Sequence, residues 1–250
     1  MLAILSPAKS LDYETPLPPV SATRPRFAGE ARRIAGAAAR LGPDRLAELM
    51  DISDRLAELN DVRYRRFGRA PLRPAIYAFA GDVYVGFEAA SLDEPAIVYA
   101  QDHLRILSGL YGLLRPLDAI RPYRLEMGTR WAPETNSLYA HWGDRVTKAL
   151  ASDLRAEGSG VIVNLASQEY WQVIAQAPPK KARVVTFDFR EEGPDGLRFN
   201  SFAAKRARGM VARYICEHRI DCVEDLKGFD SDGYLFDPSS EGDLWRFVRR

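Results

Sequence analysis

The sequence has few cysteines and histidines and almost no excess charge. Its two cysteines, Cys216 and Cys222, form no CxxC pair, and its three histidines are scattered, so no metal-binding spacing is present. We expect both cysteines to be free thiols in a reducing compartment. The 35 Lys and Arg residues nearly balance the 34 Asp and Glu residues. A polyanionic partner would therefore have to be bound by a local basic patch rather than by the global charge.

Motifs that mark a membrane span, an export signal or a common nucleotide site are also absent. No apolar run is long enough to cross a bilayer, and the N-terminus lacks a basic region followed by an apolar core and a cleavage site. The motifs GxxxxGK[ST], GxGxxG and GxSxG do not occur, so a standard nucleotide hydrolase or esterase has no support. We expect a cytoplasmic protein with no membrane partner, no metal and no cofactor.

Strand-like and helix-like segments alternate along the chain without an internal repeat. This pattern predicts one mixed α/β (α+β) domain over residues 1–250, with a central mixed sheet flanked by helices and a helical sub-lobe at 28–67. The segments predicted as strands are 1–5, 161–167, 182–189 and 197–202, the last two forming a hairpin. The segments predicted as helices are 28–40, 44–50, 53–67, 141–158, 168–177 and 203–220.

Proline and glycine set the expectations for the remaining segments. Five prolines between residues 6 and 27 predict an extended surface loop. We expect Asp44 to cap the helix that follows Gly42 and Pro43. Residues 68–100 mix proline, glycine and aromatics, which favours irregular structure with a short strand. Residues 101–118 begin with a helical pattern that is predicted to break at the glycines.

The clearest candidate for an anion-binding element is the helix predicted at 203–220. Apolar side chains are predicted to share one arc of this helix, and Lys205, Arg206, Arg208 and Arg213 to share the opposite arc. Arginine forks suit phosphate oxygens, which favours a phosphate-binding face. An ordinary solvated face is the alternative, although such faces usually mix charges of both signs.

A proline-stiffened loop carries a further pair of opposite charges. The segment LLRPLDAIRPYRLEMG holds Arg124 and Glu126 two residues apart. The two side chains could form a structural ion pair or belong to a functional site, and the sequence leaves both interpretations open.

The segment LAELMDISDRLAEL has the outline of a helix-hairpin-helix element, within residues 44–66. In that motif the hairpin and the start of the second helix, here Ser53, hold a DNA phosphate. The hairpin has no glycine, and Asp51 at its tip would repel a phosphate. The pattern by itself therefore favours a plain pair of helices.

Polar residues that follow two predicted strands point to a pocket. Ser6 and Lys9 come after the strand at 1–5, and Asn164 and Ser167 lie in the last part of the segment predicted as a strand at 161–167, just before a helix. In α/β sheets, strand ends that lead into helix N-termini form anion-binding crevices. We expect these residues to meet there, with Lys205, Arg208 and Glu126 nearby.

Long blocks of the sequence resemble the YaaA family of peroxide stress proteins. The blocks are AILSPAKSLDY, LMDISDRLAELN, FAGDVYVGF, LRILSGLYGLLRPLDAIRPYRLEMG, WGDRVT, VIVNLASQEYW, SFAAKRARGMVARYI and GFDSDGYLFD. The resemblance covers essentially the whole chain. It implies a cytoplasmic bacterial protein of the peroxide stress response, associated with limiting free iron and with DNA protection. It also implies a mixed α/β fold with a basic cleft and a helix-hairpin-helix-like element that binds double-stranded DNA.

Two functions from different classes follow. The leading hypothesis is a DNA-binding protein that contacts duplex DNA largely independently of sequence, using Lys9, Arg124, Lys205, Arg206, Arg208, Arg213 and Ser53. The alternative is an enzyme of unknown reaction on a phosphorylated or nucleotide-like small molecule, with a site around Lys9 and the pocket residues Ser6, Glu126, Asn164 and Ser167.

The surroundings of Lys9 distinguish the two hypotheses. An enzyme requires a deep pocket that encloses Lys9 and a carboxylate, whereas a DNA-binding protein requires an open groove of duplex width. In a third interpretation, Lys9 pairs with Asp12 or Glu126 and only fixes its loop. The sequence determines neither the oligomeric state nor whether any catalysis occurs.

Overall fold

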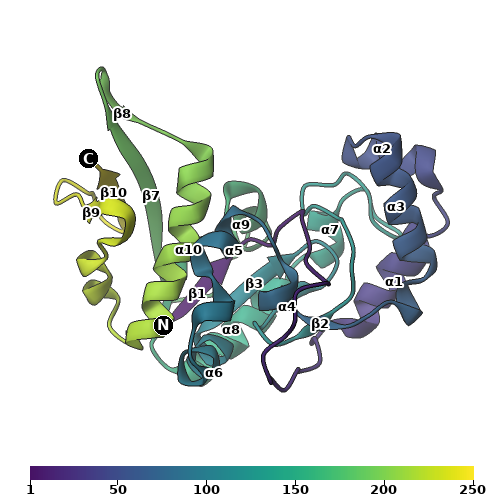
Figure 1. Ribbon diagram of the computed structural model, residues 1–250, viewed down its shortest axis with the longest axis horizontal. Helices are drawn as coiled ribbons and strands as arrows, with labels where there is room; N and C mark the ends of the chain where they lie inside the picture. Colours follow the sequence, from purple (N-terminus) through teal and green to yellow (C-terminus); the bar gives the residue numbers. More distant parts are fainter.

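An eight-stranded sheet runs through the middle of the molecule in the computed structural model, which describes residues 1–250 (Figure 1). The strand order is β4-β3-β1-β6-β7-β10-β9, with β8 paired to β7. The five strands from β3 to β10 in this order are parallel to their neighbours, whereas β4, β8 and β9 pair antiparallel. This architecture confirms the predicted mixed α/β class with a central mixed sheet flanked by helices.

The bounds of the elements follow the chain. The strands are β1 (Leu2–Leu5), β2 (Arg73–Pro74), β3 (Leu104–Ser108), β4 (Gly112–Leu114), β5 (Ala119–Ile120), β6 (Val161–Asn164), β7 (Arg183–Gly193), β8 (Gly196–Arg198), β9 (Tyr234–Phe236) and β10 (Leu244–Arg249). The helices are α1 (Ala28–Ala38), α2 (Pro43–Met50), α3 (Asp54–Arg65), α4 (Ala75–Ala78), α5 (Asp82–Phe87), α6 (Glu94–His103), α7 (Leu138–Trp142), α8 (Arg145–Glu157), α9 (Gln168–Ala175) and α10 (Ser201–His218). Short 3₁₀ helices are η1 (Phe67–Arg69), η2 (Ala89–Ser91), η3 (Val223–Gly228) and η4 (Ser231–Gly233).

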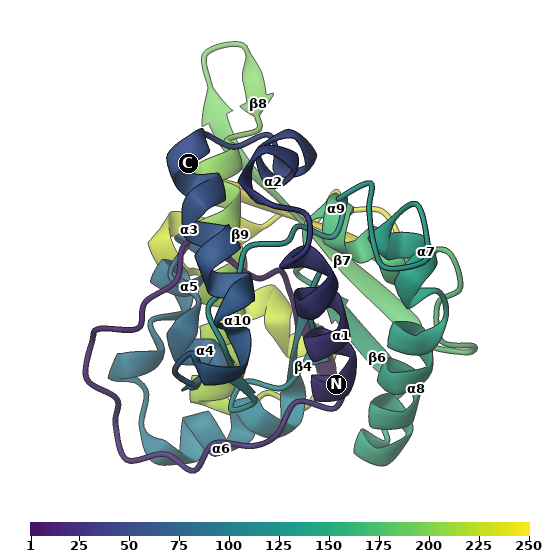
Figure 2. The same cartoon turned by 90° about the vertical axis from the view of Figure 1, so that its right-hand side faces the viewer.

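The helices form two layers over the sheet and a separate group at one end. Helices α5, α6 and α10 pack together on one face, and α8 and α9 pack together on the other (Figures 1 and 2). Helices α1, α2 and α3 gather at the end of the molecule opposite β9 and β10 (Figure 1). This group corresponds to the helical segment that the sequence predicted. No helix combines the length and the apolarity needed to cross a bilayer.

The central strands are apolar because they are covered on both faces. Every residue of β1 and β3 is buried, as expected for parallel strands between two helical layers. The predicted strand at 1–5, the extended proline-rich loop, the β7–β8 hairpin and the helices at 168–177 and 203–220 are confirmed. The helix predicted at 141–158 is divided, since α7 ends at Trp142 and α8 begins at Arg145. Gly158 ends α8 in the left-handed region, with φ of 94°.

Three local predictions were wrong. Asp44 lies inside the first turn of α2, whose N-cap is Gly42, because Pro43 already occupies the start of the helix. Residues 68–100 contain the short strand β2, as predicted, but helices α4, α5 and most of α6 replace the expected irregular structure. Residues 104–114, predicted to continue a helix, form β3 and β4, since their apolar side chains are buried in the sheet.

Two glycines bring α5 and α10 into backbone contact. A β-carbon on Gly209 of α10 would lie 1.8 Å from the Val83 carbonyl oxygen, and one on Gly86 of α5 would lie 2.1 Å from the Arg206 carbonyl oxygen. Only residues without a side chain fit at this crossing. The crossing fixes where the first half of α10 lies relative to α5.

Candidate functional site

The carboxyl ends of β1 and β6 form the crevice of this sheet. The two strands are parallel neighbours, and the chain leaves β1 toward β3 but leaves β6 toward β7, on the opposite side. Such a switch in direction leaves an open crevice at the strand ends. A pocket of about 650 Å³ lies there. Its lining comes from four separate segments, and the residues are Ser6 to Ser10, Ala80 to Val83, Val85, Leu165, Ser167 to Tyr170, Lys205 and Arg208.

A pair of serines joins the two strand ends. The Ser167 backbone N–H donates to Ser6 Oγ at 2.9 Å, and the two hydroxyl oxygens lie 3.3 Å apart. Tyr84 Oη donates to the Ser6 carbonyl oxygen at 3.0 Å, which ties the strand end to α5. Burial raises the pKa of Tyr84 well above its ordinary value, so the phenol remains a donor. These bonds fix the floor of the pocket.

The loop after β1 also holds the start of α5. The Ala80 N–H donates to the Ser10 carbonyl oxygen at 3.0 Å, and a β-carbon on Gly81 would lie 2.9 Å from the Ala8 β-carbon. This close packing places Asp82, in the first turn of α5, at the pocket wall. The sequence reasoning missed Asp82, although the quoted block FAGDVYVGF contains it.

Lys9 belongs to a chain of charges that leaves the pocket. Lys9 Nζ lies 2.8 Å from Glu126 Oε2, and Arg124 Nη2 lies 3.4 Å from Glu126 Oε1. Tyr64 of α3 donates a short hydrogen bond to the Arg124 carbonyl oxygen, which links this loop to the helical group. The expected pairing of Lys9 with Glu126 is therefore present, while 61% of the Lys9 side chain is still exposed. The Arg124–Glu126 ion pair is present as well.

Helix α10 supplies two further cations to the pocket. Lys205 and Arg208, three residues apart, both line it. The prediction that Arg208 lies on the solvent-facing arc was wrong, because position 208 follows the buried Ala204 by one helical turn. Burial lowers the pKa of Arg208, and the carboxylate of Asp188 partly offsets this. Arg208 Nε is shielded from solvent and has no hydrogen-bond partner.

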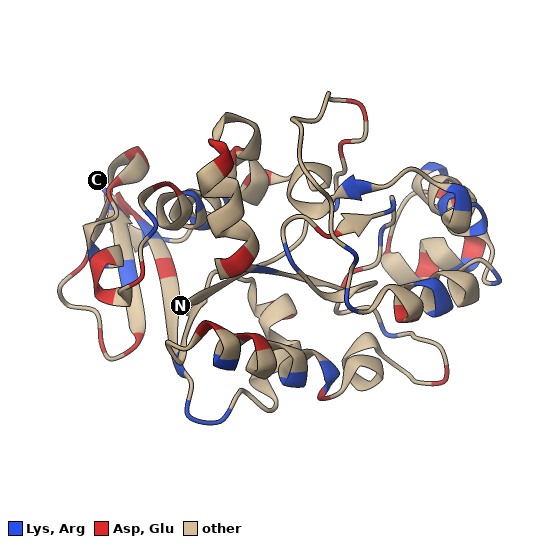
Figure 3. Ribbon diagram, turned by 90° about the horizontal axis from the view of Figure 1, so that it is seen from below, with Lys and Arg blue, Asp and Glu red and all other residues tan.

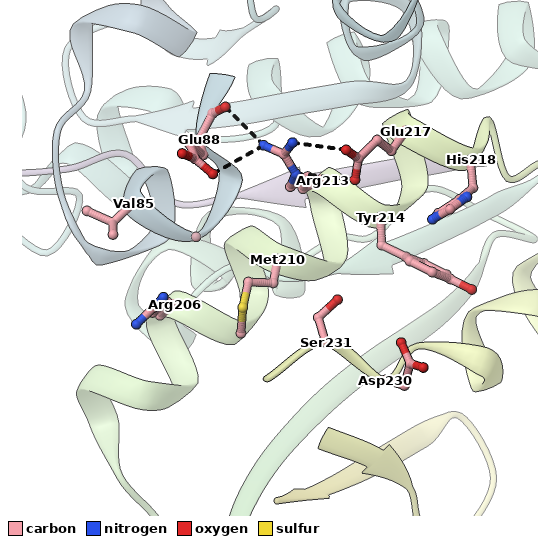
Figure 4. A pocket seen from close by; sticks show the side chains of 11 residues that line it. Val85, Glu88, Arg206, Met210, Arg213, Tyr214, Glu217, His218, Asp230 and Ser231 are labelled. Carbon is pink, nitrogen blue, oxygen red and sulfur yellow. Dashed lines mark hydrogen bonds and ion pairs between the residues drawn. The ribbon is translucent and has the colours of Figure 1, made fainter. Parts of the chain in front are cut away.

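Arg206 and Arg213 lie on a different side of α10, along a second pocket of about 280 Å³ (Figure 4). Arg213 contacts Glu217 at 2.9 Å, Glu88 at 3.6 Å and the Phe87 carbonyl oxygen at 3.2 Å. These contacts hold Arg213 against the end of α5. Arg206 is exposed and has no acidic partner. The four cations predicted to share one arc are thus divided between two pockets.

The other predicted residues lie outside the pocket wall. Asn164 is buried, and its Oδ1 accepts the Ala166 N–H at 3.1 Å, so it shapes the turn after β6. Glu126 reaches the site only through Lys9. Ser53 is the exposed N-cap of α3, and its side chain makes no capping bond. Helices α2 and α3 pack as a pair joined by residues 51–53, with Asp51 in the left-handed conformation at φ of 48°.

The pocket also contains residues that the sequence reasoning did not single out. Glu169 and Tyr170 are in the first turn of α9, and Glu169 Oε1 accepts the Gly128 N–H at 3.0 Å. Their position in the sequence, directly after Ser167, could have identified them.

Outside the two pockets, basic and acidic residues are interspersed along the ribbon (Figure 3). No group of three or more His, Cys, Asp or Glu side chains is arranged to hold a metal ion. Cys216 and Cys222 are free thiols.

Comparison with known proteins gives the relationship of the chain. A family model described as peroxide stress protein YaaA matches residues 1–240. A UPF0246 protein of Rhizorhabdus wittichii is 65% identical over 100% of this chain and 99% of its own length. A UPF0246 protein of Paraburkholderia phytofirmans is 49% identical over 100% of this chain and 98% of its own length. A UPF0246 protein of Idiomarina loihiensis is 47% identical over 97% of this chain and 96% of its own length. The chain therefore belongs to the YaaA family of peroxide stress proteins.

Proposed function

We propose that this peroxide stress protein binds duplex DNA, largely independently of sequence, through the cations of α10. The observation that carries the proposal is that Lys205, Arg206 and Arg208 have no acidic partner. Many other arginines in the chain do, including Arg105 with Asp153 and Arg213 with Glu217. Unpaired cations clustered on one helix are suited to a partner that brings its own negative charges.

The distribution of these cations favours an extended polyanion. Lys205 and Arg208 line the strand-end pocket, whereas Arg206 lines the second pocket on another side of α10. Val85 lies between and borders both. A compact molecule in one pocket would leave Arg206 unused, but successive backbone phosphates can follow the ridge between the pockets. Asp51 is in the same turn as Ser53, and its carboxylate would repel a phosphate. We therefore assign the main DNA contact to α10 rather than to the α2–α3 turn.

Salt-dependent binding tests this proposal. Labelled duplex DNA is titrated with the wild-type protein at 50 and 200 mM salt, where binding dominated by phosphate contacts falls by orders of magnitude. The Lys205→Gln/Arg206→Gln variant should bind more weakly and lose about two units of the log–log salt slope, since each phosphate contact contributes roughly 0.9. The matched control is Arg32→Gln/Arg155→Gln, which removes two exposed charges from α1 and α8. Equal losses in both variants would refute a specific role for α10.

A second function is favoured by the shape of the strand-end pocket. Its lining combines Lys9, which is still 61% exposed, with the carboxylates of Asp82 and Glu169, a set of charges suited to an enzyme or binding protein for a phosphorylated or nucleotide-like small molecule. The small-molecule function would use the interior of the pocket, whereas DNA binding would use the exposed ridge of α10 between the two pockets. The association with free iron and DNA protection, which the family resemblance implies, stays a prediction.

A further inference from the structure

We propose that the strand-end pocket binds a 5′-mononucleotide unit, with its phosphate held by Arg208 and by the first turn of α9. The inference rests on the second function proposed above and names its ligand class. The unit has two possible sources, a free nucleotide or a nucleotide displaced from a DNA strand. Both present the same phosphate, sugar and base.

Arg208 is the least exposed of the three cations that line the pocket. Its Nε is buried without a partner, and an N–H donor shielded from water without an acceptor is costly. Asp188, the nearest acid to influence it, already accepts bonds from Arg190 at 2.9 Å and Arg246 at 3.3 Å. Arg208 lines the pocket and forms no ion pair within the protein, so its guanidinium is available to a phosphate there, and a guanidinium is the side chain best shaped to hold phosphate oxygens.

The amide end of α9 faces the same space. Ser167 is the N-cap, and its own N–H is taken by Ser6 Oγ at 2.9 Å. The next three N–H groups, of Gln168, Glu169 and Tyr170, have no acceptor within the protein. All three residues line the pocket. Unpaired N–H groups and the positive end of the helix dipole favour a bound anion.

The other residues that line the pocket favour a ligand larger than an inorganic ion. Three cations (Lys9, Lys205 and Arg208) and two carboxylates (Asp82 and Glu169) line the pocket. Lys9 is paired with Glu126, so Lys205 and Arg208 are the cations left to neutralise an anion. The carboxylates can accept hydrogen bonds from sugar hydroxyls or base amino groups. Val83, Val85 and Leu165 add apolar surface.

The size of the pocket agrees with this ligand. A volume of about 650 Å³ is in the range of sites that enclose a whole small molecule, and it is much larger than a single phosphate needs. The pocket is therefore large enough for a base and a sugar beside the phosphate.

Isothermal titration of the full-length protein tests the inference. The probes are the four 5′-mononucleotides, the matching nucleosides and inorganic phosphate. We expect at least one mononucleotide to bind at least tenfold more tightly than its nucleoside and than phosphate. The Arg208→Gln variant should lose at least tenfold in affinity, and Arg155→Gln, an exposed position on α8 outside the pocket lining, should change it less than twofold.

A second variant guards against misfolding of Arg208→Gln. Gln168→Pro removes one free N–H at the first position of α9, where proline is tolerated. Ser167 before it already has the extended conformation that a following proline requires, with φ of −69° and ψ of 158°. We expect this variant to keep its fold and to bind the mononucleotide several-fold more weakly. Unchanged affinity in both variants would overturn the proposed phosphate position.

The remaining outcomes separate this inference from the functions proposed above. If phosphate binds as tightly as every mononucleotide, the pocket is an anion site and the nucleotide inference fails alone. If no small probe binds while duplex DNA does, both the inference and the small-molecule function fail. If free mononucleotides bind and compete with a duplex containing an unpaired nucleotide but not with an intact duplex, a displaced nucleotide is a second source of the ligand.

Discussion

Gly209 and Val83 pack backbone against backbone: a β-carbon on Gly209 would lie 1.8 Å from the Val83 carbonyl oxygen. The same two helices carry Arg206, on the ridge proposed for DNA, and Val85, which borders both pockets. Because a carbonyl oxygen in a helix cannot move aside alone, the two helices can approach this closely only when residue 209 is glycine.

The Gly209→Ala substitution should therefore separate α10 from α5. We expect it to destabilise the protein by about 1–3 kcal/mol or more, as overpacking does, and to weaken mononucleotide binding through the displaced Arg208. Urea unfolding and titration measure the two effects. Gly36→Ala in α1 is the control, since a β-carbon there meets nothing within 4 Å and alanine stabilises a helix by about 1 kcal/mol relative to glycine. If Gly209→Ala raised the free energy of unfolding as Gly36→Ala does, the close crossing of α5 and α10 would be contradicted.

The hydrogen bond from Tyr84 to the Ser6 carbonyl oxygen should support the floor of the pocket. Tyr84→Phe keeps the ring packing and removes a buried bond of 3.0 Å, so we expect a loss of about 1–3 kcal/mol. Because the unpaired carbonyl belongs to a pocket residue, mononucleotide affinity should fall as well. Denaturant unfolding and titration of the same sample check this. Tyr99→Phe removes a hydroxyl that bonds the exposed Asp221, and it should leave the affinity unchanged.

Glu126 should restrain the cations beside the pocket. It contacts Lys9 at 2.8 Å and Arg124 at 3.4 Å. Replacing it with Gln removes the competing negative charge, so we expect a several-fold gain in affinity for duplex DNA at 50 mM salt. Lys9→Ala should have the opposite effect and reduce the salt slope by about one unit. If Lys9→Ala changes neither binding nor slope, Lys9 serves only to fix its loop.

Asp153 should make stability depend on acid pH. Its buried carboxylate accepts hydrogen bonds from Arg26 and from Arg105 Nε, the latter at 2.6 Å. Burial by itself would raise its pKa, but these two bonds bring the pKa below the ordinary value of 3.8. A lowered pKa stabilises the fold above 3.8, and this contribution is lost as the pH falls further.

The Asp153→Asn variant tests this dependence. We expect it to cost about 3–5 kcal/mol at pH 7, because it leaves the buried Arg105 without its counter-charge. The difference from wild type should begin to shrink below pH 3.8, because the carboxylate of the unfolded chain takes up a proton there while the native one, with its lowered pKa, stays ionised until a lower pH. Urea unfolding at pH 7 and at pH 3 measures it. A deficit that is the same at both pH values would show that Asp153 titrates normally.

Local sequence patterns were sufficient for the outer elements and insufficient for the centre. Gly158 marked the end of α8, and the apolar run at 1–5 marked β1. In contrast, β3 is buried on both faces, so Leu104 to Ser108 show no alternation that distinguishes a strand from the end of the preceding helix. Gly81 and Gly86 favoured a loop at the position of α5, and only the crossing with α10 explains why Gly86 lies inside the helix.

The residues of the candidate site were likewise predictable where a local pattern marks them and not predictable where a tertiary contact places them. Ser6, Lys9 and Ser167 were predictable because each follows a strand that leads into a loop or helix. Arg208 was correctly placed at the pocket but wrongly assigned to an exposed arc. Asp82 was missed because its position depends on the packing of Gly81 against Ala8, which is a tertiary contact with no local pattern.

The pocket wall is built from four segments that extend from Ser6 to Arg208, almost the full length of the chain. A fragment would have to span residues 6–208 to contain all of them, so the pocket exists only when most of the chain is folded. Its occupant therefore binds the native state and not the unfolded one, and it must raise the melting temperature of the entire protein. At a concentration one hundred times Kd, this stabilisation is about 2.7 kcal/mol. A melting screen of metabolites can thus identify the natural occupant without any assay of activity.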